Sequence, residues 1–320
     1  MDLSTRYLGL ELKNPFVPSS SPLSKNLDSA RQLEDCGASA IIMHSLFQEE
    51  IAEDSTTHRG SEMGSHHATS SPLARRDEYL EQFVRLKKSL DIPIIPSLNG
   101  TSVGDWVNYA TELETAGADA LELNAYYFAA DLNETADAVE QRVVSLFRAV
   151  RDQVSLPVGV KLSPFFSSLG NLVKSLEASG ASGIALFNRF YQPNIDLETL
   201  QLSAALDLST SGDALLAMRW LAILKGRVDL SLAATGGIHF AEDALKMILC
   251  GADVTYLGST LLANGPRQLT RIHDSTVRWL EEHGYESIEQ IKGLMSQAKS
   301  SDPAAFERGH YMKLLQSYKL

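Results

Sequence analysis

The sequence lacks several features that would assign it to a special class of protein. Only two of its 320 residues are cysteine, Cys36 and Cys250, and they do not have the spacing of metal ligands. A disulfide scaffold is therefore excluded. No apolar run approaches the roughly 20 residues of a membrane helix, and the first residues contain no hydrophobic signal core. These absences predict a soluble cytoplasmic protein.

Basic residues are also scarce. The chain has 28 Lys and Arg against 40 Asp and Glu, a net charge of −12, and no block of basic residues. A nucleic-acid or anionic-membrane partner is therefore not expected. The remaining composition, 44% hydrophobic and 21% charged, is that of a globular protein. No linker or low-complexity stretch divides the chain, which predicts one domain over residues 1–320.

Short apolar runs alternate with longer stretches whose apolar residues have helical spacing. The candidate strands are 16–17, 40–43, 92–98, 120–123, 157–162, 183–187, 231–234 and 254–257, and clear helical stretches are 77–90, 106–116, 134–154 and 240–249. Repeated Gly-Ala pairs mark the ends of helices. Eight such units predict a (β/α)₈ TIM barrel, with residues 264–320 as closing and C-terminal helices that include 285–295 and 303–320. A doubly wound open sheet is the alternative, disfavoured because no dinucleotide fingerprint follows the first strand.

Polar residues stand at the ends of nearly all these strands, where such a barrel places its site. Asn99, Asn124, Lys161 and Asn188 each end a strand, and a barrel filled by aliphatic residues would not place them at equivalent depths without a polar ligand. A network of loop hydrogen bonds is the alternative. An ammonium group at Lys161 is expected to face an anion or an electron-rich ring, the alternative being an exposed surface lysine.

Glycines end the last two strands. Gly236 and Gly237 follow the seventh strand, and Gly258 and Ser259 follow the eighth. Backbone N–H groups at glycines can approach an anion closely, and these two loops bind phosphate in many TIM barrels. The pair of loops therefore predicts a phosphorylated ligand. The alternative is that the glycines only form two tight turns.

Several motifs resemble those of the dihydroorotate dehydrogenase family. They are Val160-Lys161-Leu162-Ser163-Pro164, Thr235-Gly236-Gly237-Ile238 followed by Glu242-Asp243-Ala244-Leu245, and Cys250-Gly251-Ala252 leading to Gly258-Ser259. The likeness covers nearly the whole chain. It implies a (β/α)₈ barrel that binds flavin mononucleotide (FMN) and an oxidoreductase that acts on a CH–CH bond.

The resemblance assigns roles to individual residues. Lys161 resembles the lysine at the electron-accepting edge of the flavin, where a cation would stabilise the reduced ring. The residues implied in cofactor binding are Ser19, Ser20, Ser21, Ser45, Asn99, Asn124, Lys161, Asn188, Gly212, Gly236, Gly237, Gly258 and Ser259. Asn124 and Asn188 are also expected to meet the substrate.

The sequence departs from the family pattern on the substrate side. Tyr127 stands where relatives carry a Ser or Cys base, and a phenol suits proton donation better than abstraction. We therefore expect Tyr127→Phe to keep flavin but suppress turnover; Tyr126 could exchange roles with it, and an aromatic lid is the alternative. His44 replaces a lysine and is a candidate donor to substrate or flavin, or a core hydrogen-bonding group. Arg189 suits a substrate carboxylate, or a salt bridge that fixes its loop.

Dihydroorotate is one expected substrate, which would place the chain in pyrimidine biosynthesis, and another small unsaturated carbonyl or cyclic amide is the second. A flavin- or phosphate-binding barrel with a partner role, or a phosphosugar or nucleotide enzyme without flavin, are the alternatives. A soluble electron acceptor is expected, and a homodimer is an open expectation. His58, His66 and His67 lack the spacing of a metal site and indicate a solvated loop or a lid, so no metal is expected.

Overall fold

The computed structural model describes residues 1–51, 72–203, 206–307 and 311–317 of the chain. Its centre is one eight-stranded sheet with the order β3-β12-β11-β8-β7-β6-β5-β4, in which all paired neighbours are parallel. The strands are β3 (Phe16–Pro18), β4 (Ile41–Phe47), β5 (Ile94–Asn99), β6 (Leu121–Asn124), β7 (Val158–Leu162), β8 (Gly183–Leu186), β11 (Ser231–Thr235) and β12 (Val254–Leu257).

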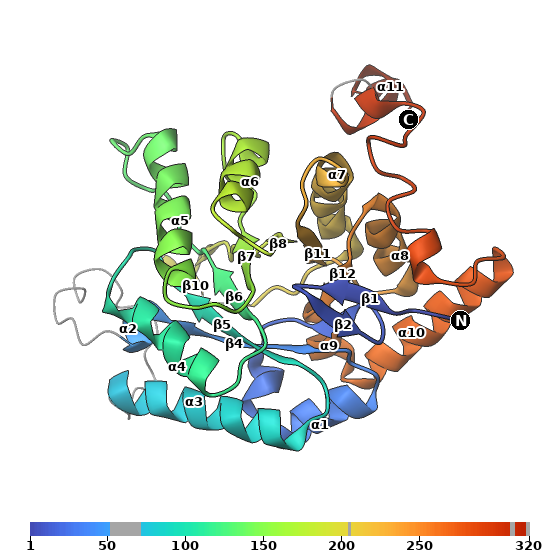
Figure 1. Cartoon of the computed structure of the whole chain (residues 1–320). Coiled ribbons are helices and arrows are strands. Elements are labelled where there is room, and N and C mark those ends of the chain that lie inside the picture. Colours follow the sequence, from blue (N-terminus) through green and yellow to red (C-terminus); the bar gives the residue numbers. More distant parts are fainter. Residues whose placement is uncertain (52–71, 204–205, 308–310, 318–320) are drawn as a thin grey trace.

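Helices surround this sheet, as Figure 1 shows. They are α1 (Leu27–Asp35), α3 (Pro72–Ser89), α4 (Tyr109–Thr115), α5 (Ala136–Arg151), α6 (Leu169–Ala178), α7 (Ala214–Leu224), α8 (Ala241–Cys250) and α10 (Arg267–Glu282), with short α2 (Gln48–Ile51), α9 (Ser259–Asn264) and α11 (Tyr311–Ser317).

The sheet closes on itself. The last strand β12 pairs with the first, β3, with Thr255 beside Phe16. On the other side of β3, the Ser39 N–H just before β4 donates to the Phe16 carbonyl at 3.1 Å, and the Ser39 hydroxyl donates to it at 3.0 Å. Because every strand lies beside its neighbours in the sequence, the predicted (β/α)₈ barrel is confirmed and the open sheet is excluded.

Local chemistry fixes where the helices begin and end. The Asn26 side chain accepts the Asp28 N–H at 2.7 Å and caps α1. Helix α8 ends at Gly251, whose φ of +116° suits glycine. A Cβ there would lie 2.5 Å from the Lys225 side chain, so glycine also allows close packing. The Gly-Ala signal in the sequence therefore has two physical causes.

The interior of the barrel is plugged from its N-terminal end. The antiparallel hairpin of β1 (Thr5–Tyr7) and β2 (Leu10–Leu12) lies in front of the strands in Figure 1. Its Tyr7 and Leu8 are buried. A Cβ on Gly183 would come within 2.7 Å of the Leu8 side chain, so the bare backbone of β8 makes room for the plug.

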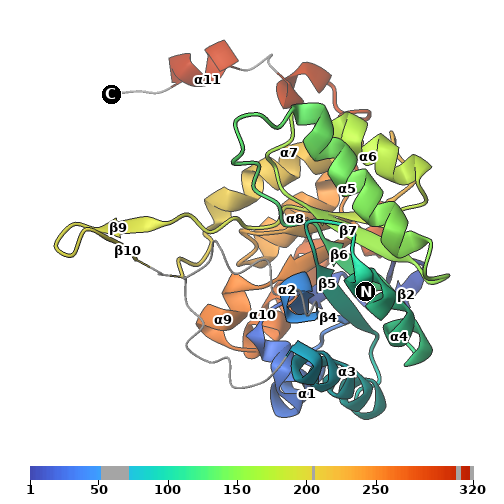
Figure 2. The ribbon, with the colours of Figure 1, turned by 90° about the vertical axis from the view of Figure 1, so that its left-hand side faces the viewer.

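Two regions differ from the sequence predictions. A hairpin of exposed strands, β9 (Asn194–Asp196) and β10 (Gln201–Ser203), projects from the barrel in Figure 2. The helix expected near 285–295 is wrong: only the 3₁₀ turn Ile288–Gln290 forms. The Gly293 and Met295 N–H groups donate instead to the carbonyls of Ile248 and Leu249 at 2.9 and 2.7 Å. Bonding to α8 replaces the hydrogen bonds of a helix.

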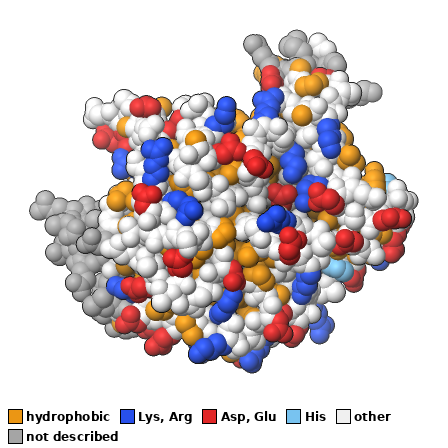
Figure 3. Space-filling model, viewed as in Figure 1, with side chains coloured by type: hydrophobic (Ala, Val, Ile, Leu, Met, Phe, Trp, Pro, Cys, Tyr) orange, Lys and Arg blue, Asp and Glu red, His pale blue; other side chains and the backbone are white. Residues whose placement is uncertain are grey.

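The surface carries charges of both signs. Acidic and basic side chains are interspersed over the face in Figure 3, with apolar side chains between them. Within the described part of the chain, every helix is too short or too polar to span a membrane.

Candidate active site

A cavity of about 1070 Å³ opens at the C-terminal ends of the strands. Most of the residues predicted for the site line it: Ser19, Ser20, Ser21, His44, Ser45, Asn99, Asn124, Tyr126, Lys161, Asn188, Arg189, Gly236, Gly237, Gly258 and Ser259. Two predicted residues, Tyr127 and Gly212, are not part of its lining. The three histidines of the predicted lid lie outside the described residues.

Three of the polar residues share one row across the sheet. Asn99 pairs in register with Asn124, and Asn124 pairs with Lys161, so all three side chains point into the barrel at the same height. The Asn188 amide donates to Asn124 Oδ1, and Asn124 Nδ2 donates to Ser45 Oγ at 3.4 Å. These bonds hold the Asn124 amide in one orientation.

The amide nitrogen of Asn99 has no such partner. Asn99 is 3% exposed, and its buried Nδ2 makes no hydrogen bond within the described part of the protein. Leaving a buried donor unpaired costs about 1–3 kcal/mol. A ligand that accepts a hydrogen bond at this position would remove that cost.

Lys161 is a buried cation that forms no ion pair with the described residues. It is 6% exposed, and no carboxylate among the described residues lies within 4 Å of its Nζ. Its electrostatic neighbour is the carboxyl group of Glu122, which lies lower in the barrel. An ammonium group in this position attracts an anion to the cavity.

The loops after β11 and β12 form the opposite wall. Gly236 has φ +89° and open space where a Cβ would stand, whereas a Cβ on Gly237 would lie 2.3 Å from the Ala214 nitrogen. The Ser209 hydroxyl accepts the Gly237 N–H at 3.2 Å, and the Ser209 N–H donates to Ser259 Oγ at 3.1 Å. These contacts bind the two loops together beside the cavity. Such a cradle of glycine backbone fits a phosphate group.

Gly212 does not line the cavity, but its 3₁₀ turn, Ser211–Asp213, lies beside the cradle, because a Cβ on Gly237 would come 2.8 Å from the Thr210 carbonyl oxygen. Asp213 accepts the N–H of Thr210 at 2.7 Å, and this bond holds the pKa of its carboxyl below the usual value, with a smaller effect from Arg189. The turn thus satisfies its own polar groups. Arg189 lines the cavity, and its buried Nη1 has no hydrogen-bond partner among the described residues.

The two candidate tyrosines point in different directions. Tyr126 lines the cavity and stacks on Phe190, with ring centroids 4.2 Å apart. Tyr127 turns outward, where its hydroxyl donates to Glu134 Oε2 at 2.6 Å and the Arg142 guanidinium lies 4.5 Å from its ring centroid. The geometry therefore does not support the proton-donor role predicted for Tyr127. Successive residues of an extended segment point to opposite sides, so only one of the two can face the site.

His44 lies at the cavity wall with its backbone N–H donating to Ser24 Oγ at 2.7 Å. Its ring packs edge to face against Tyr79 at 4.9 Å. Burial, with a smaller effect from Lys25, lowers the pKa of His44 to about 4. The imidazole is therefore neutral near pH 7 and has one N–H to donate.

Sequence reasoning missed a polar layer below the cavity. Glu122 is 2% exposed and accepts a hydrogen bond from Ser97 Oγ at 3.3 Å. Near it, the hydroxyls of Tyr7 and Tyr256 are 2.7 Å apart, and Tyr256 also lines the cavity. The signal was present: in Leu121-Glu122-Leu123-Asn124 the apolar residues alternate with polar ones, so Glu122 must share the inward face with Asn124.

The two cysteines lie away from the cavity. Cys36 ends α1 and Cys250 ends α8, both at the far rim of the barrel from the cavity. Elsewhere in the described ranges, no group of three His, Cys, Asp or Glu side chains is arranged to hold a metal ion.

Comparison with known proteins adds an independent finding. A model of the dihydroorotate dehydrogenase family matches residues 2–280. The catalytic subunit of dihydroorotate dehydrogenase B (NAD(+)) from Bacillus pumilus (strain SAFR-032) is 28% identical over 305 residues, covering 91% of this chain and 96% of that protein. The corresponding Pyrococcus furiosus subunit (strain ATCC 43587 / DSM 3638 / JCM 8422 / Vc1) is 27% identical over 303 residues, covering 92% and 99%.

Proposed function

Because this chain belongs to the dihydroorotate dehydrogenase family, we propose that it is an FMN-dependent oxidoreductase acting on a CH–CH bond. Its substrate is dihydroorotate or another small unsaturated carbonyl or cyclic amide. The observation that supports this most strongly is that a glycine cradle and Lys161, which is buried and has no ion pair with any described residue, share one cavity. The phosphate of one bound FMN would occupy the glycine cradle, and its electron-accepting ring would lie against Lys161.

The residues present fit FMN. Gly236, Gly237, Gly258 and Ser259 would hold its phosphate, and Lys161 and the orphaned amide of Asn99 would meet the polar edge of its ring. When bound, FMN accepts a hydride from a carbon atom or returns one to it. The cation at Lys161 favours added negative charge in the cavity.

The remaining polar groups suit a flat substrate that carries carbonyl groups. The paired amides of Asn124 and Asn188 offer donors and acceptors with fixed orientation, and neutral His44 offers one further donor. Arg189 suits a carboxylate because its Nη1 lacks a partner among the described residues. Tyr126 replaces Tyr127 as our candidate for proton transfer, because its side chain lines the cavity.

We further propose a cytoplasmic protein that passes electrons to a soluble acceptor, directly or through a second subunit, and that forms a homodimer. The acidic composition supports the absence of a nucleic-acid partner. The relatives are named as catalytic subunits, which motivates the test for a second subunit.

The test is an absorbance spectrum of the purified protein followed by anaerobic mixing with dihydroorotate. Flavin bands that bleach would establish dihydroorotate oxidation. Bands that persist would retain the cofactor and exclude this substrate, and the same assay would then be run with other unsaturated carbonyls and cyclic amides. A protein that binds no FMN would overturn the proposal.

A second candidate function is a flavin-binding barrel without turnover. It is favoured by one observation: Tyr127, at the position of the family base, is held outside the cavity by Glu134. The two functions differ in the fate of photoreduced flavin. An enzyme should transfer electrons to some small acceptor faster than to oxygen, whereas a binding protein should show reoxidation by oxygen alone.

A further inference from the structure

A row of hydroxyl groups connects the cavity to the buried carboxyl group of Glu122. Ser45 on β4, Ser97 on β5 and Glu122 on β6 are register partners on three adjacent strands, one row below Asn124 and Lys161. The Ser45 and Ser97 hydroxyls are 2.9 Å apart, and Ser97 Oγ donates to Glu122 Oε1 at 3.3 Å. The row is thus continuous from the cavity wall to the carboxyl group.

Only the upper part of this row is open to the cavity. Ser45 and Ser20, whose hydroxyls are 3.2 Å apart, line the cavity. Ser97 is fully buried and does not line it. Within this row of serines, Glu122 is joined to the cavity through the Ser97 hydroxyl. The Tyr256 hydroxyl, from a side chain that lines the cavity, also interacts with the Glu122 carboxyl.

Glu122 itself is poorly compensated. Its Oε2 is buried and has no hydrogen-bond partner among the described residues. Burial raises the pKa of this carboxyl, and Lys161 opposes that rise. The other titratable groups that face it, Tyr7, Tyr79 and Tyr256, have pKa values raised by burial and stay protonated. Glu122 is therefore the group of this layer that can change charge.

We propose that Glu122 stores a proton for the cavity and exchanges it through the hydroxyl groups of Ser97 and Ser45. This inference rests on the proposed function, because it links the stored proton to reduction of bound FMN. Lys161 lines the cavity on the neighbouring strand, one inward row above Glu122, so a single ammonium group faces both the Glu122 carboxyl and any anion in the cavity. When negative charge arises in the cavity, Glu122 takes up a proton.

The transfer balances along the row. A buffer acid gives a proton to Ser20, Ser20 gives its own proton to Ser45, Ser45 to Ser97, and Ser97 to Glu122 Oε1. Each serine breaks one O–H bond and forms another, so the net change is one proton lost by the buffer and one gained by the carboxylate. Reoxidation reverses the same steps.

The main experiment measures the midpoint potential of bound FMN against pH in the wild type and in Glu122→Gln. For a two-electron couple, each proton taken up contributes about 30 mV per pH unit. We expect the wild-type slope to exceed the slope of Glu122→Gln by about that amount, 30 mV per pH unit, over part of the range. Tyr7→Phe is the matched control, because it removes the hydroxyl near Glu122 and leaves the row to the cavity intact; its slope should equal that of the wild type.

The route is tested by Ser97→Ala, which removes a hydroxyl that does not line the cavity. Its equilibrium slope should be that of the wild type, while proton uptake after light-driven reduction, followed with an indicator dye, should slow by at least about tenfold. Wild-type uptake in Ser97→Ala would overturn the route.

Equal slopes of midpoint potential against pH in the wild type and Glu122→Gln would overturn the proposal that Glu122 stores a proton. If Glu122→Gln fails to fold, the infrared difference spectrum of the wild type decides instead: reduction should produce a band of a protonated carboxyl, and its absence would refute the inference. A wild-type protein that binds no FMN would overturn the proposed function as well, so the two failures are distinguishable.

Discussion

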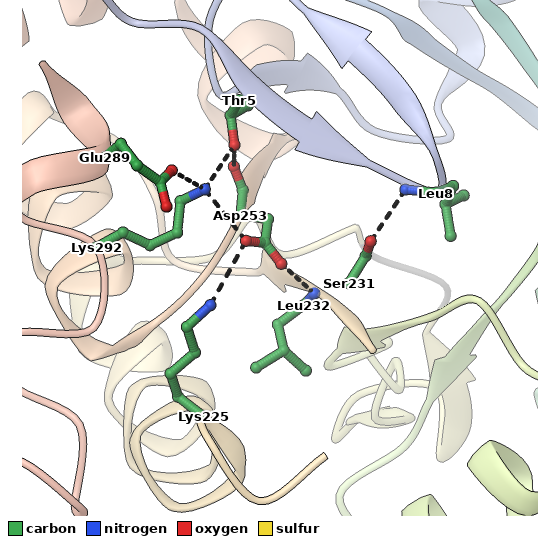
Figure 4. A network of polar contacts seen from close by, with 8 residues as sticks. All are labelled: Thr5, Leu8, Lys225, Ser231, Leu232, Asp253, Glu289 and Lys292. Atoms are coloured by element: carbon green, nitrogen blue, oxygen red, sulfur yellow. Dashed lines mark hydrogen bonds and ion pairs between the residues drawn. The ribbon is translucent and has the colours of Figure 1, made fainter. Parts of the chain in front are cut away.

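Buried charges have close ion-pair partners at the N-terminal end of the barrel and lack them, among the described residues, at the C-terminal end. At the N-terminal end, Asp253 is surrounded by partners: its carboxylate lies 3.3 Å from Lys292 Nζ and 3.7 Å from Lys225 Nζ, and it accepts the Leu232 N–H at 2.8 Å (Figure 4). Lys292 also pairs with Glu289 at 2.7 Å. At the C-terminal end, Lys161 has no ion pair with any described residue.

Both ends therefore contain a buried lysine, but among the described residues only Lys292 has carboxylates within 4 Å of its ammonium group. Lys292 joins the segment after α10 to the floor of the barrel, and its side chain is 6% exposed. Lys161 has similar burial, forms no ion pair within 4 Å with any described residue, and has Glu122 only as a more distant electrostatic neighbour. A compensated charge stabilises the fold, whereas an uncompensated one indicates where a ligand supplies the missing charge.

Breaking the compensated end should have the largest effect. Asp253→Ala removes the carboxylate shared by Lys225 and Lys292 and leaves Lys292 with only the exposed Glu289, so we expect it to lower the free energy of unfolding by about 3–5 kcal/mol. Denaturant unfolding would measure this loss. Asp229→Ala, at an exposed aspartate, is the control and should change little. Equal stability of both variants would contradict the comparison.

At the C-terminal end of the barrel, His44 should make the free energy of unfolding depend on pH. The pKa of His44 is about 4 in the folded protein and about 6.5 in an unfolded chain, so the unfolded chain binds more protons between these values. Stability should fall by about 3 kcal/mol as the pH falls from above 6.5 to about 4. His44→Gln should lose this dependence when unfolding is measured across that range, whereas His283→Gln, at an exposed histidine, should retain it.

Substituting the lysine at the open end should weaken FMN binding and leave stability unchanged or improved. Lys161→Met removes a charge-assisted contact worth about 1.5–3 kcal/mol, which corresponds to roughly tenfold to hundredfold weaker FMN binding. Lys292→Met should show the reverse pattern, with lower stability and unchanged affinity. Thermal melts without FMN and fluorescence titration with FMN would measure the two quantities. A large loss of stability in Lys161→Met would contradict the proposal that Lys161 serves ligand binding while Lys292 stabilises the fold.

The smallest effect is expected for Tyr127→Phe. It removes one partly exposed hydrogen bond to Glu134, worth about 1 kcal/mol, at a position outside the cavity. FMN affinity and turnover should be near those of the wild type, in contrast to the suppression that the sequence position alone predicts. Tyr126→Phe is the comparison and should reduce turnover more; steady-state assays on a substrate that bleaches the flavin would decide between them.

Much of the fold follows from the sequence because buried parallel strands are short apolar runs. The run 120–123 differs from β6 (Leu121–Asn124) by one residue at each end, and Gly251 marks the end of α8. The β9–β10 hairpin could not be found in this way, because its strands are exposed and carry no buried face. The segment after α10 was predicted wrongly because its backbone bonds to another helix, which no local pattern records.

The candidate site was predictable to the same degree. The rule that barrel sites lie at strand ends places Asn99, Asn124 and Lys161 without coordinates. The rule does not extend past the strand, so it could not tell whether Tyr126 or Tyr127 faces inward. It also looks only at the ends, and so it passed over Glu122, which lies inside a strand.

The seam between β3 and β12 has a consequence for how the protein is made. The Thr255 hydroxyl donates to the Pro15 carbonyl across 240 positions of the chain, and Lys292 Nζ donates to Thr5 Oγ1 across 287. A ribosome therefore completes seven of the eight strands before the ring can close, and until then β3 presents an unpaired edge. The wall that carries Gly258 is the last to form, so a nascent chain acquires its cavity only after β12 has been made.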